Sequence, residues 1–170
     1  MKEVTIPPQT LGEISIETAF DALFSREFLK KIHGDSLRVS GWNEDDERTI
    51  QFSVNIDKVP IELRRIFCGN KLRITTHQTV RKEPGQWTVT NKLKMHCLGA
   101  EFVRVRPVFV LGTDADSHTT HISVRVEHDA FMPPPINRVV ETFMASQTRR
   151  ELESYEAIVR EHFGIFTGHS

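Results

Sequence analysis

The chain is poor in the features that most often reveal a function directly. Its 170 residues include two cysteines, Cys68 and Cys97, too few for a disulfide framework, which favours a reducing, cytoplasmic location. With 22 basic and 23 acidic residues, the net charge is −1, so no broad field of one sign attracts nucleic acid or an anionic membrane. No apolar run approaches the ~20 residues that span a bilayer, and the first residues lack the apolar core of a signal peptide.

Catalytic and metal-binding motifs are also missing. The sequence has no Gly-x-Ser-x-Gly nucleophile motif, no phosphate-binding glycine loop and no dinucleotide fingerprint. His118 and His121 are three residues apart, so on a strand they would face opposite sides, and no cysteine or carboxylate completes a ligand set nearby. We therefore expect no bound metal and no cofactor, and we single out no catalytic nucleophile.

The chain does have a central segment in which two runs of residues can pair so that their apolar side chains lie on the same face. Folding Lys71–Arg81 onto Thr88–Leu98 around the turn at 83–86 sorts the side chains into two faces. The apolar face pairs Leu72 with Cys97, Ile74 with Met95, Thr76 with Leu93 and Val80 with Val89. The opposite face collects Lys71, Arg73, Thr75, His77, Lys92 and Lys94. This pattern predicts a hairpin with one dry face.

Two further hairpins are predicted on either side of it. One joins Ser36–Trp42 to Glu47–Asp57, and the other joins Glu101–Leu111 to Thr119–His128. The expected pairs are Leu37 with Phe52, Val39 with Ile50, Phe109 with Ile122, Pro107 with Val124, Val105 with Val126, and on the outer face Arg104 with Glu127. Proline has no backbone N–H to donate to a ladder, so we expect a local bend at Pro107.

The remaining segments predict one more strand and three helices. Leu11–Ile16 favours a strand, and a capping-box pattern at Thr18 followed by Ser25 and Gly34 predicts two short helices. Apolar residues at helical spacing predict a long helix from Pro133 to about Phe163, with a bend near the polar run at 147–151. The fold class is therefore α+β: a curved antiparallel sheet of about seven strands around a long C-terminal helix, with two short helices after the first strand.

This order of elements resembles the helix-grip fold of the START-like superfamily, which includes lipid-transfer domains, plant allergens and bacterial aromatase/cyclases. The residues that carry the resemblance are Ile14–Phe24, Phe28–Lys31, Val39-Ser40-Gly41-Trp42 and Arg48-Thr49-Ile50, which look like the opening of VASt (StAR-related) domains. The segment Val59–Phe67 also looks like a family of small, uncharacterised bacterial START-like proteins. The likeness covers about Thr10–His162 and implies a single domain over residues 1–170, with its core at about 10–162.

A sheet wrapped on a helix predicts a cavity, so our leading expectation is non-catalytic binding, or transfer, of a lipid, sterol or other apolar small molecule. The expected ligand-binding residues are Ile74, Thr76, Gln78, Asn91, Leu93, Met95, Val105, Phe109, Ile122, Val124, His128, Val140, Phe143, Met144 and Gln147. Gln78 and Asn91 face each other and would be either polar contacts for a guest or a satisfied buried amide pair. His128 would be either a ligand contact or base, or a structural histidine.

Two other readings stay open. An enzyme of the cyclase or hydratase type would act on a hydrophobic substrate, and a fully packed adaptor would bind proteins with its outer faces. The connector containing Leu63, Arg64, Arg65, Ile66 and Phe67 is either a lid that touches lipid phosphates or a loop anchored by its apolar side. The basic outer face of the central hairpin has no interleaved aromatic residues for stacking bases, so no nucleic acid is expected. The oligomeric state is left open.

Overall fold

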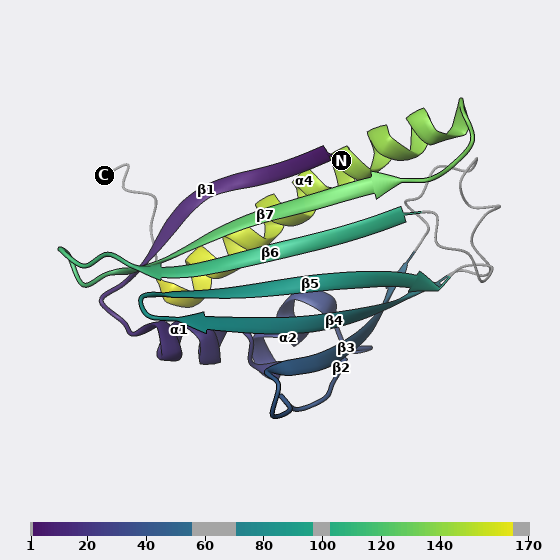
Figure 1. The fold of residues 1–170 in the computed structure, drawn as a ribbon. Coiled ribbons are helices and arrows are strands. Elements are labelled where there is room, and N and C mark those ends of the chain that lie inside the picture. Colours follow the sequence, from purple (N-terminus) through teal and green to yellow (C-terminus); the bar gives the residue numbers. More distant parts are fainter. Residues whose placement is uncertain (1, 56–70, 97–102, 165–170) are drawn as a thin grey trace.

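A seven-stranded antiparallel sheet is the largest element of the protein (Figure 1). The computed structural model describes residues 2–55, 71–96 and 103–164. In chain order the elements are β1 (Lys2–Gly12), α1 (Ile16–Leu23), α2 (Arg26–His33), β2 (Arg38–Val39), β3 (Glu47–Asn55), β4 (Lys71–Glu83), β5 (Gln86–His96), β6 (Val103–Thr113), β7 (Thr120–Ala130) and α4 (Ile136–Phe163). The strands lie side by side in the order β1-β7-β6-β5-β4-β3-β2.

The three helices of the described residues lie against one face of this curved sheet. The long helix α4 packs against β1 and β7, α1 packs against β6, and α2 packs against β3. In Figure 1 α4 runs behind the sheet along its length. The helix α1 lies below the C-terminal end of α4, and α2 lies beside α1. This α+β, helix-grip-like arrangement confirms the fold class and the order of elements predicted from the sequence.

The central hairpin has the predicted register. Ile74 pairs with Met95, Thr76 with Leu93 and Val80 with Val89. The turn that joins β4 to β5 contains only Pro84 and Gly85, between the paired residues Glu83 and Gln86. A turn this short leaves little freedom to the pairing of the arms, because turn type and loop length fix the register of a hairpin. The predicted pair of Leu72 with Cys97 extends outside the described residues.

The register predicted for the last hairpin was wrong by two residues. Phe109 pairs with Val124 instead of Ile122, Val105 with His128, and Pro107 with Val126. On the outer face Arg104 lies opposite Asp129, and Arg106 lies opposite Glu127. A shift of two keeps every side chain on its predicted face, because alternation has a period of two. The shift nonetheless moves each residue of β7 along the sheet, which matters for the site below.

The strand β6 continues through Pro107, as predicted. Its pairing with β5 passes from Thr90 opposite Val108 to Leu93 opposite Val105, so the ladder is interrupted beside the proline. The Pro107 carbonyl there accepts a hydrogen bond from the Asn91 side-chain amide. A side chain thus replaces a ladder contact at the residue that cannot donate one.

The prediction for the first strand was wrong in its bounds. The strand runs over Lys2–Gly12, and the predicted strand residue Ile16 begins α1. The pairing of β1 with β7 shifts register between Ile6 and Gln9, where Pro7 and Pro8 lie. Prolines are tolerated at such an irregularity on an edge strand. Because they interrupt the alternation of apolar and polar residues, the sequence pattern did not reveal the first half of this strand.

The helix ends agree with the sequence in part. The hydroxyl of Ser25 accepts from the Phe28 amide and caps α2, and Gly34 ends that helix with φ 82°, both as predicted. The first helix, in contrast, is capped by Ser15 and not by Thr18: the Ser15 hydroxyl accepts from the Thr18 amide. The long helix α4 is continuous through residues 147–151 and ends at Phe163.

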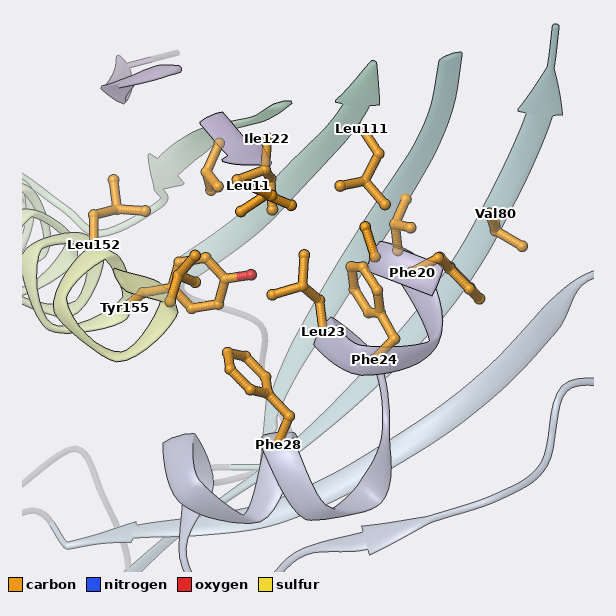
Figure 2. Close-up of a cluster of buried hydrophobic side chains, with 14 of the residues drawn as sticks. Leu11, Phe20, Leu23, Phe24, Phe28, Val80, Leu111, Ile122, Leu152 and Tyr155 are labelled. Atoms are coloured by element: carbon orange, nitrogen blue, oxygen red, sulfur yellow. The ribbon is translucent and has the colours of Figure 1, made fainter. Parts of the chain in front are cut away.

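The core gathers where α1, α2 and α4 meet the sheet. Figure 2 shows Phe28 from α2 and Tyr155 from α4 around Leu23 of α1. Phe28, Leu23, Leu111 and Ile122 have at most 1% of their surface exposed. Aromatic rings add directional contacts, since Phe28 and Tyr155 meet edge to face with centroids 6.2 Å apart. The larger cluster of buried side chains therefore gathers around α1, and a second, smaller one lies where α2 meets β2 to β4.

Candidate functional site

A cavity of about 620 Å³ lies between the sheet, the helix pair and α4. Its wall is formed mainly by apolar side chains from five neighbouring strands, β3 to β7, and from helices α1, α2 and α4. The strands contribute Ile50, Phe52, Ser53, Val54, Leu72, Ile74, Thr76, Gln78, Asn91, Leu93, Val103, Val105, Pro107, Phe109, Val124 and Val126. The helices and the segment before α4 contribute Leu23, Phe24, Leu29, Ile32, His33, Met132, Val140, Phe143, Met144, Gln147, Thr148, Glu151, Leu152, Ser154, Tyr155 and Ile158.

The cavity ends along a line that crosses the sheet and steps by one row between β5 and β6, because Phe109 lies opposite Val89. Along β4, Leu72, Ile74, Thr76 and Gln78 line the cavity, and the next inward residue, Val80, is packed in the core. On β5 the change comes between Asn91 and Val89, on β6 between Phe109 and Leu111, and on β7 between Val124 and Ile122. Gln78 and Asn91 are therefore the polar residues at the edge of the cavity that adjoins Val80 and Val89.

Most of the predicted ligand-binding residues lie in this cavity wall. Those that line it are Ile74, Thr76, Gln78, Asn91, Leu93, Val105, Phe109, Val124, Val140, Phe143, Met144 and Gln147. Met95 pairs with Ile74, but its side chain is outside the described part of the structure. The residues expected in the lid, Leu63, Arg64, Arg65, Ile66 and Phe67, also lie outside the described residues.

Ile122 and His128 do not line the cavity, in contrast to the expectation. Ile122 is fully buried in the core, because the true register places it opposite Leu111, one row beyond the cavity's end. His128 is 3% exposed and lies between Val105 on β6 and Lys2 on β1. Burial, and then the nearby Lys2 ammonium, lower the pKa of His128, so its imidazole is neutral at pH 7.

A chain of hydrogen bonds joins the two amides to a buried arginine. The Nε of Arg48 donates to Gln78 Oε1 at 2.6 Å, Gln78 Nε2 donates to Asn91 Oδ1 at 2.7 Å, and Asn91 Nδ2 donates to the Pro107 carbonyl at 3.1 Å. Gln78 and Asn91 are each 3% exposed, and Arg48 is 7% exposed. We refer to Arg48, Gln78 and Asn91 as the polar network.

Arg48 is an unusual member of this network because it is buried and pairs with no carboxylate of the described residues. Its guanidinium lies 4.3 Å from the ring centroid of Trp42, and its Nη2 has no hydrogen-bond partner among the described residues. Burial lowers the pKa of Arg48 to about 10, which leaves the side chain charged at neutral pH. The sequence could have revealed it, because the alternation that turns Ile50 inward also turns Arg48 inward.

The contribution of the helix pair was also missed from the sequence. His33 at the end of α2 stacks on Phe52 of β3, with ring centroids 3.9 Å apart, and both rings line the cavity. Burial lowers the pKa of His33 to about 4. Tyr155 of α4 also lines the cavity and contacts Phe28 and Phe109, and burial raises the pKa of its hydroxyl. At pH 7 both polar groups are neutral.

Other kinds of site find little support in the described part of the chain. No three His, Cys, Asp or Glu side chains in residues 2–55, 71–96 and 103–164 are placed to hold a metal ion. Within the same ranges, no helix combines the length and apolar character needed to cross a membrane.

Comparisons with known proteins show the fold and no more. No family model matches the chain, and no curated protein matches it. A conserved protein from Geobacillus kaustophilus has a similar structure, with a TM-score of 0.55 and 10% identity over 95% of this chain and 92% of that one. A protein from Rhizobium loti gives 0.54 and 14% identity over 92% and 96%, and an uncharacterised protein from Rhizobium leguminosarum gives 0.52 and 10% over 94% and 96%. At these identities the likeness shows a shared α+β fold alone.

Proposed function

We propose that this protein binds, and transfers, a lipid or other apolar small molecule in the cavity between the sheet and α4. The observation that carries the proposal is the cavity itself. Its volume of about 620 Å³ falls within the roughly 300–1,000 Å³ of pockets that hold small molecules. An apolar guest would gain roughly 25 cal/mol per Å² of apolar surface removed from water, without any catalytic group.

The composition of the wall supports an irregular, flexible guest. Met144 and Met132 line the cavity together with Phe143 and Phe109. Methionine is unbranched and polarizable, so it adapts to guests of different shape. The resemblance of the sequence to START-like domains is consistent with the same function, because that superfamily includes lipid-transfer domains.

The two alternatives draw less support from the site. An adaptor with a fully packed interior does not need a cavity of this size. A cyclase or hydratase that uses His128 would need that imidazole in the cavity wall, and His128 lies outside it. Gln78 and Asn91 remain in the wall, and their amides can orient a guest but have no pKa suited to proton transfer near pH 7.

Extraction of the purified protein, followed by mass spectrometry of the extract, tests the proposal. We expect an apolar molecule in stoichiometric amount with the wild type, and much less with Leu93→Trp, since Leu93 lies in the middle of the cavity floor between Thr76 and Val105. Lys92→Trp is the matched control, because Lys92 is exposed on the other face of the same strand. If the purified protein holds nothing and also fails to bind an added apolar fluorophore, N-phenyl-1-naphthylamine, the proposal is wrong.

A further inference from the structure

The direction of every hydrogen bond in the polar network is fixed by its two ends. A guanidinium can only donate, so the Gln78 oxygen must face Arg48. A backbone carbonyl can only accept, so the Asn91 nitrogen must face Pro107. The remaining bond, from Gln78 Nε2 to Asn91 Oδ1, is then the only arrangement compatible with both ends.

This arrangement leaves donors unused at the end of the cavity. Each side-chain amide nitrogen carries two hydrogens, and the network uses one from Gln78 and one from Asn91. Both residues line the cavity, and the second N–H of each has no partner among the described residues. Buried donors without a partner cost free energy, and a guest that supplies an acceptor would remove that cost.

The charge at this end of the cavity has the same sign as the donors. Arg48 holds a positive charge behind Gln78, and no ion pair links it to an acidic residue of the described chain. The acidic residue of the described cavity wall, Glu151, lies on α4, where its carboxyl accepts from Gln147 and burial raises its pKa. In a region of low dielectric, an uncompensated buried cation strengthens the binding of an anion several-fold more than it would in water.

We propose that the guest carries its polar group at its buried end and that this group is a carboxylate, so that the cargo is an apolar monocarboxylic acid of the fatty-acid class. This inference rests on the proposed function and names the chemistry of the same site. The carboxylate would accept from the free N–H groups of Gln78 and Asn91, and the positive field of Arg48 would act through Gln78. The hydrocarbon would extend along Thr76, Leu93 and Val105 toward Met144 on α4.

Competition among three ligands of equal chain length tests this proposal. N-phenyl-1-naphthylamine, which is neutral, is first bound to the delipidated protein and then displaced by dodecanoic acid, methyl dodecanoate or dodecanol. We expect the acid to displace the probe at a concentration at least about tenfold lower than the ester or the alcohol, since hydrogen bonds to a charged group are worth roughly 10- to 100-fold in affinity.

Two variants of Arg48 test whether the preference for the acid depends on the polar network. Arg48→Met keeps a long apolar side chain against Trp42 but removes the charge, and should bring the acid within about threefold of the ester. Arg48→Lys keeps the charge and should retain most of the preference. Arg38→Met is the control, because Arg38 is an exposed arginine on β2, next to β3.

The outcomes separate this inference from the function on which it depends. If the wild type does not bind the probe, the cavity does not take apolar guests and both ideas fail. If the probe binds but the three ligands compete equally, or dodecanol competes best, binding stands and the carboxylate is wrong. Should Arg48→Met fail to fold, the comparison of acid and ester in the wild type still decides the question.

Discussion

At the scale of single residues, Gln78 is the side chain on which two other buried polar groups depend. Its oxygen is the acceptor for Arg48, and its nitrogen is the donor to Asn91. A buried charge tolerates the loss of its partner poorly, because no water replaces the missing bond. The stability of this part of the sheet is therefore tied to the same contacts that would orient a guest.

Replacing Gln78 with leucine should destabilise the protein by about 2–6 kcal/mol, since two buried polar groups lose a partner at a typical cost of about 1–3 kcal/mol each. Thr76→Val is the matched control, because Thr76 is the neighbouring inward residue of β4 and its hydroxyl takes no part in the network. That change should cost less than about 1 kcal/mol. Urea unfolding followed by circular dichroism measures both. Equal losses would show that the network contributes nothing beyond ordinary packing.

His33 should make the stability depend on pH. Its pKa is about 4 in the folded protein and about 6.5 in an unfolded chain. Between these values the unfolded state binds more protons, so stability is full above about pH 6.5 and falls as the pH drops toward 4, by up to about 1.4 kcal/mol per pH unit. His33→Phe keeps a ring against Phe52 and removes this contribution.

The measurement is the difference in unfolding free energy between pH 7 and pH 5. The wild type should lose up to about 2 kcal/mol more than His33→Phe over this interval. His118→Asn is the control, since His118 is exposed in the turn between β6 and β7 and asparagine suits its φ of 56°. A loss that is the same in wild type and His33→Phe would contradict the assignment.

At the scale of elements, the end of α2 that faces α1 is fixed by a single serine. The Ser25 hydroxyl accepts from the Phe28 amide at 3.1 Å and donates to the Ala22 carbonyl at 3.0 Å. It thereby joins the two helices whose residues Leu23, Leu29 and His33 close one side of the cavity. A weak cap would loosen that wall as well as the helix.

Ser25→Ala should therefore cost about 1 kcal/mol, the usual value for a lost N-cap. Ser25→Asp retains the acceptor for the Phe28 amide but not the donor to Ala22, so it should lose less. Thermal unfolding of the three proteins gives the order. Alanine and aspartate variants of equal stability would mean that the cap does not hold α2.

The elements also show what a sequence can and cannot fix. The register of β4 and β5 was predictable because a two-residue turn and strict alternation on both arms allow one pairing. The loop before β7 is longer, and a shift of two leaves every side chain on its own face, so alternation could not choose between Val124 and Ile122 as the partner of Phe109. The strand β1 was hidden because its prolines interrupt the pattern that reveals a strand.

The same uncertainty of register explains which residues of the candidate site were predictable. Residues facing the interior were predictable from alternation, which is why most of the cavity wall was anticipated, but the level at which the cavity ends depends on register and on where α1 and α4 pack. Ile122 was misplaced for that reason. Alternation turns Arg48 inward, but the sequence alone does not show which neutral side chain accepts its hydrogen bond. Its part in the site was therefore missed.

At the scale of the whole molecule, the larger buried cluster gathers around α1, and the cavity lies under the middle of α4. Side chains that line a cavity have fewer protein neighbours than side chains in a filled core. An occupied cavity restores those contacts only in the folded state. The stability of the whole domain should therefore increase with the concentration of a guest, whichever apolar molecule serves as the guest.

The size of this increase can be calculated from mass action. At a free ligand concentration 100 times the dissociation constant, a guest that binds only the folded state adds about 2.7 kcal/mol. For a chain of 170 residues, each kcal/mol shifts the melting temperature by about 2–4 °C, so dodecanoic acid should raise it by about 5–10 °C. Leu93→Trp, which fills the cavity floor, should show no such rise, while Lys92→Trp should respond as the wild type does. A rise of equal size in Leu93→Trp would place the binding site outside the cavity, because that variant changes the cavity and leaves the outer face of the sheet as it was.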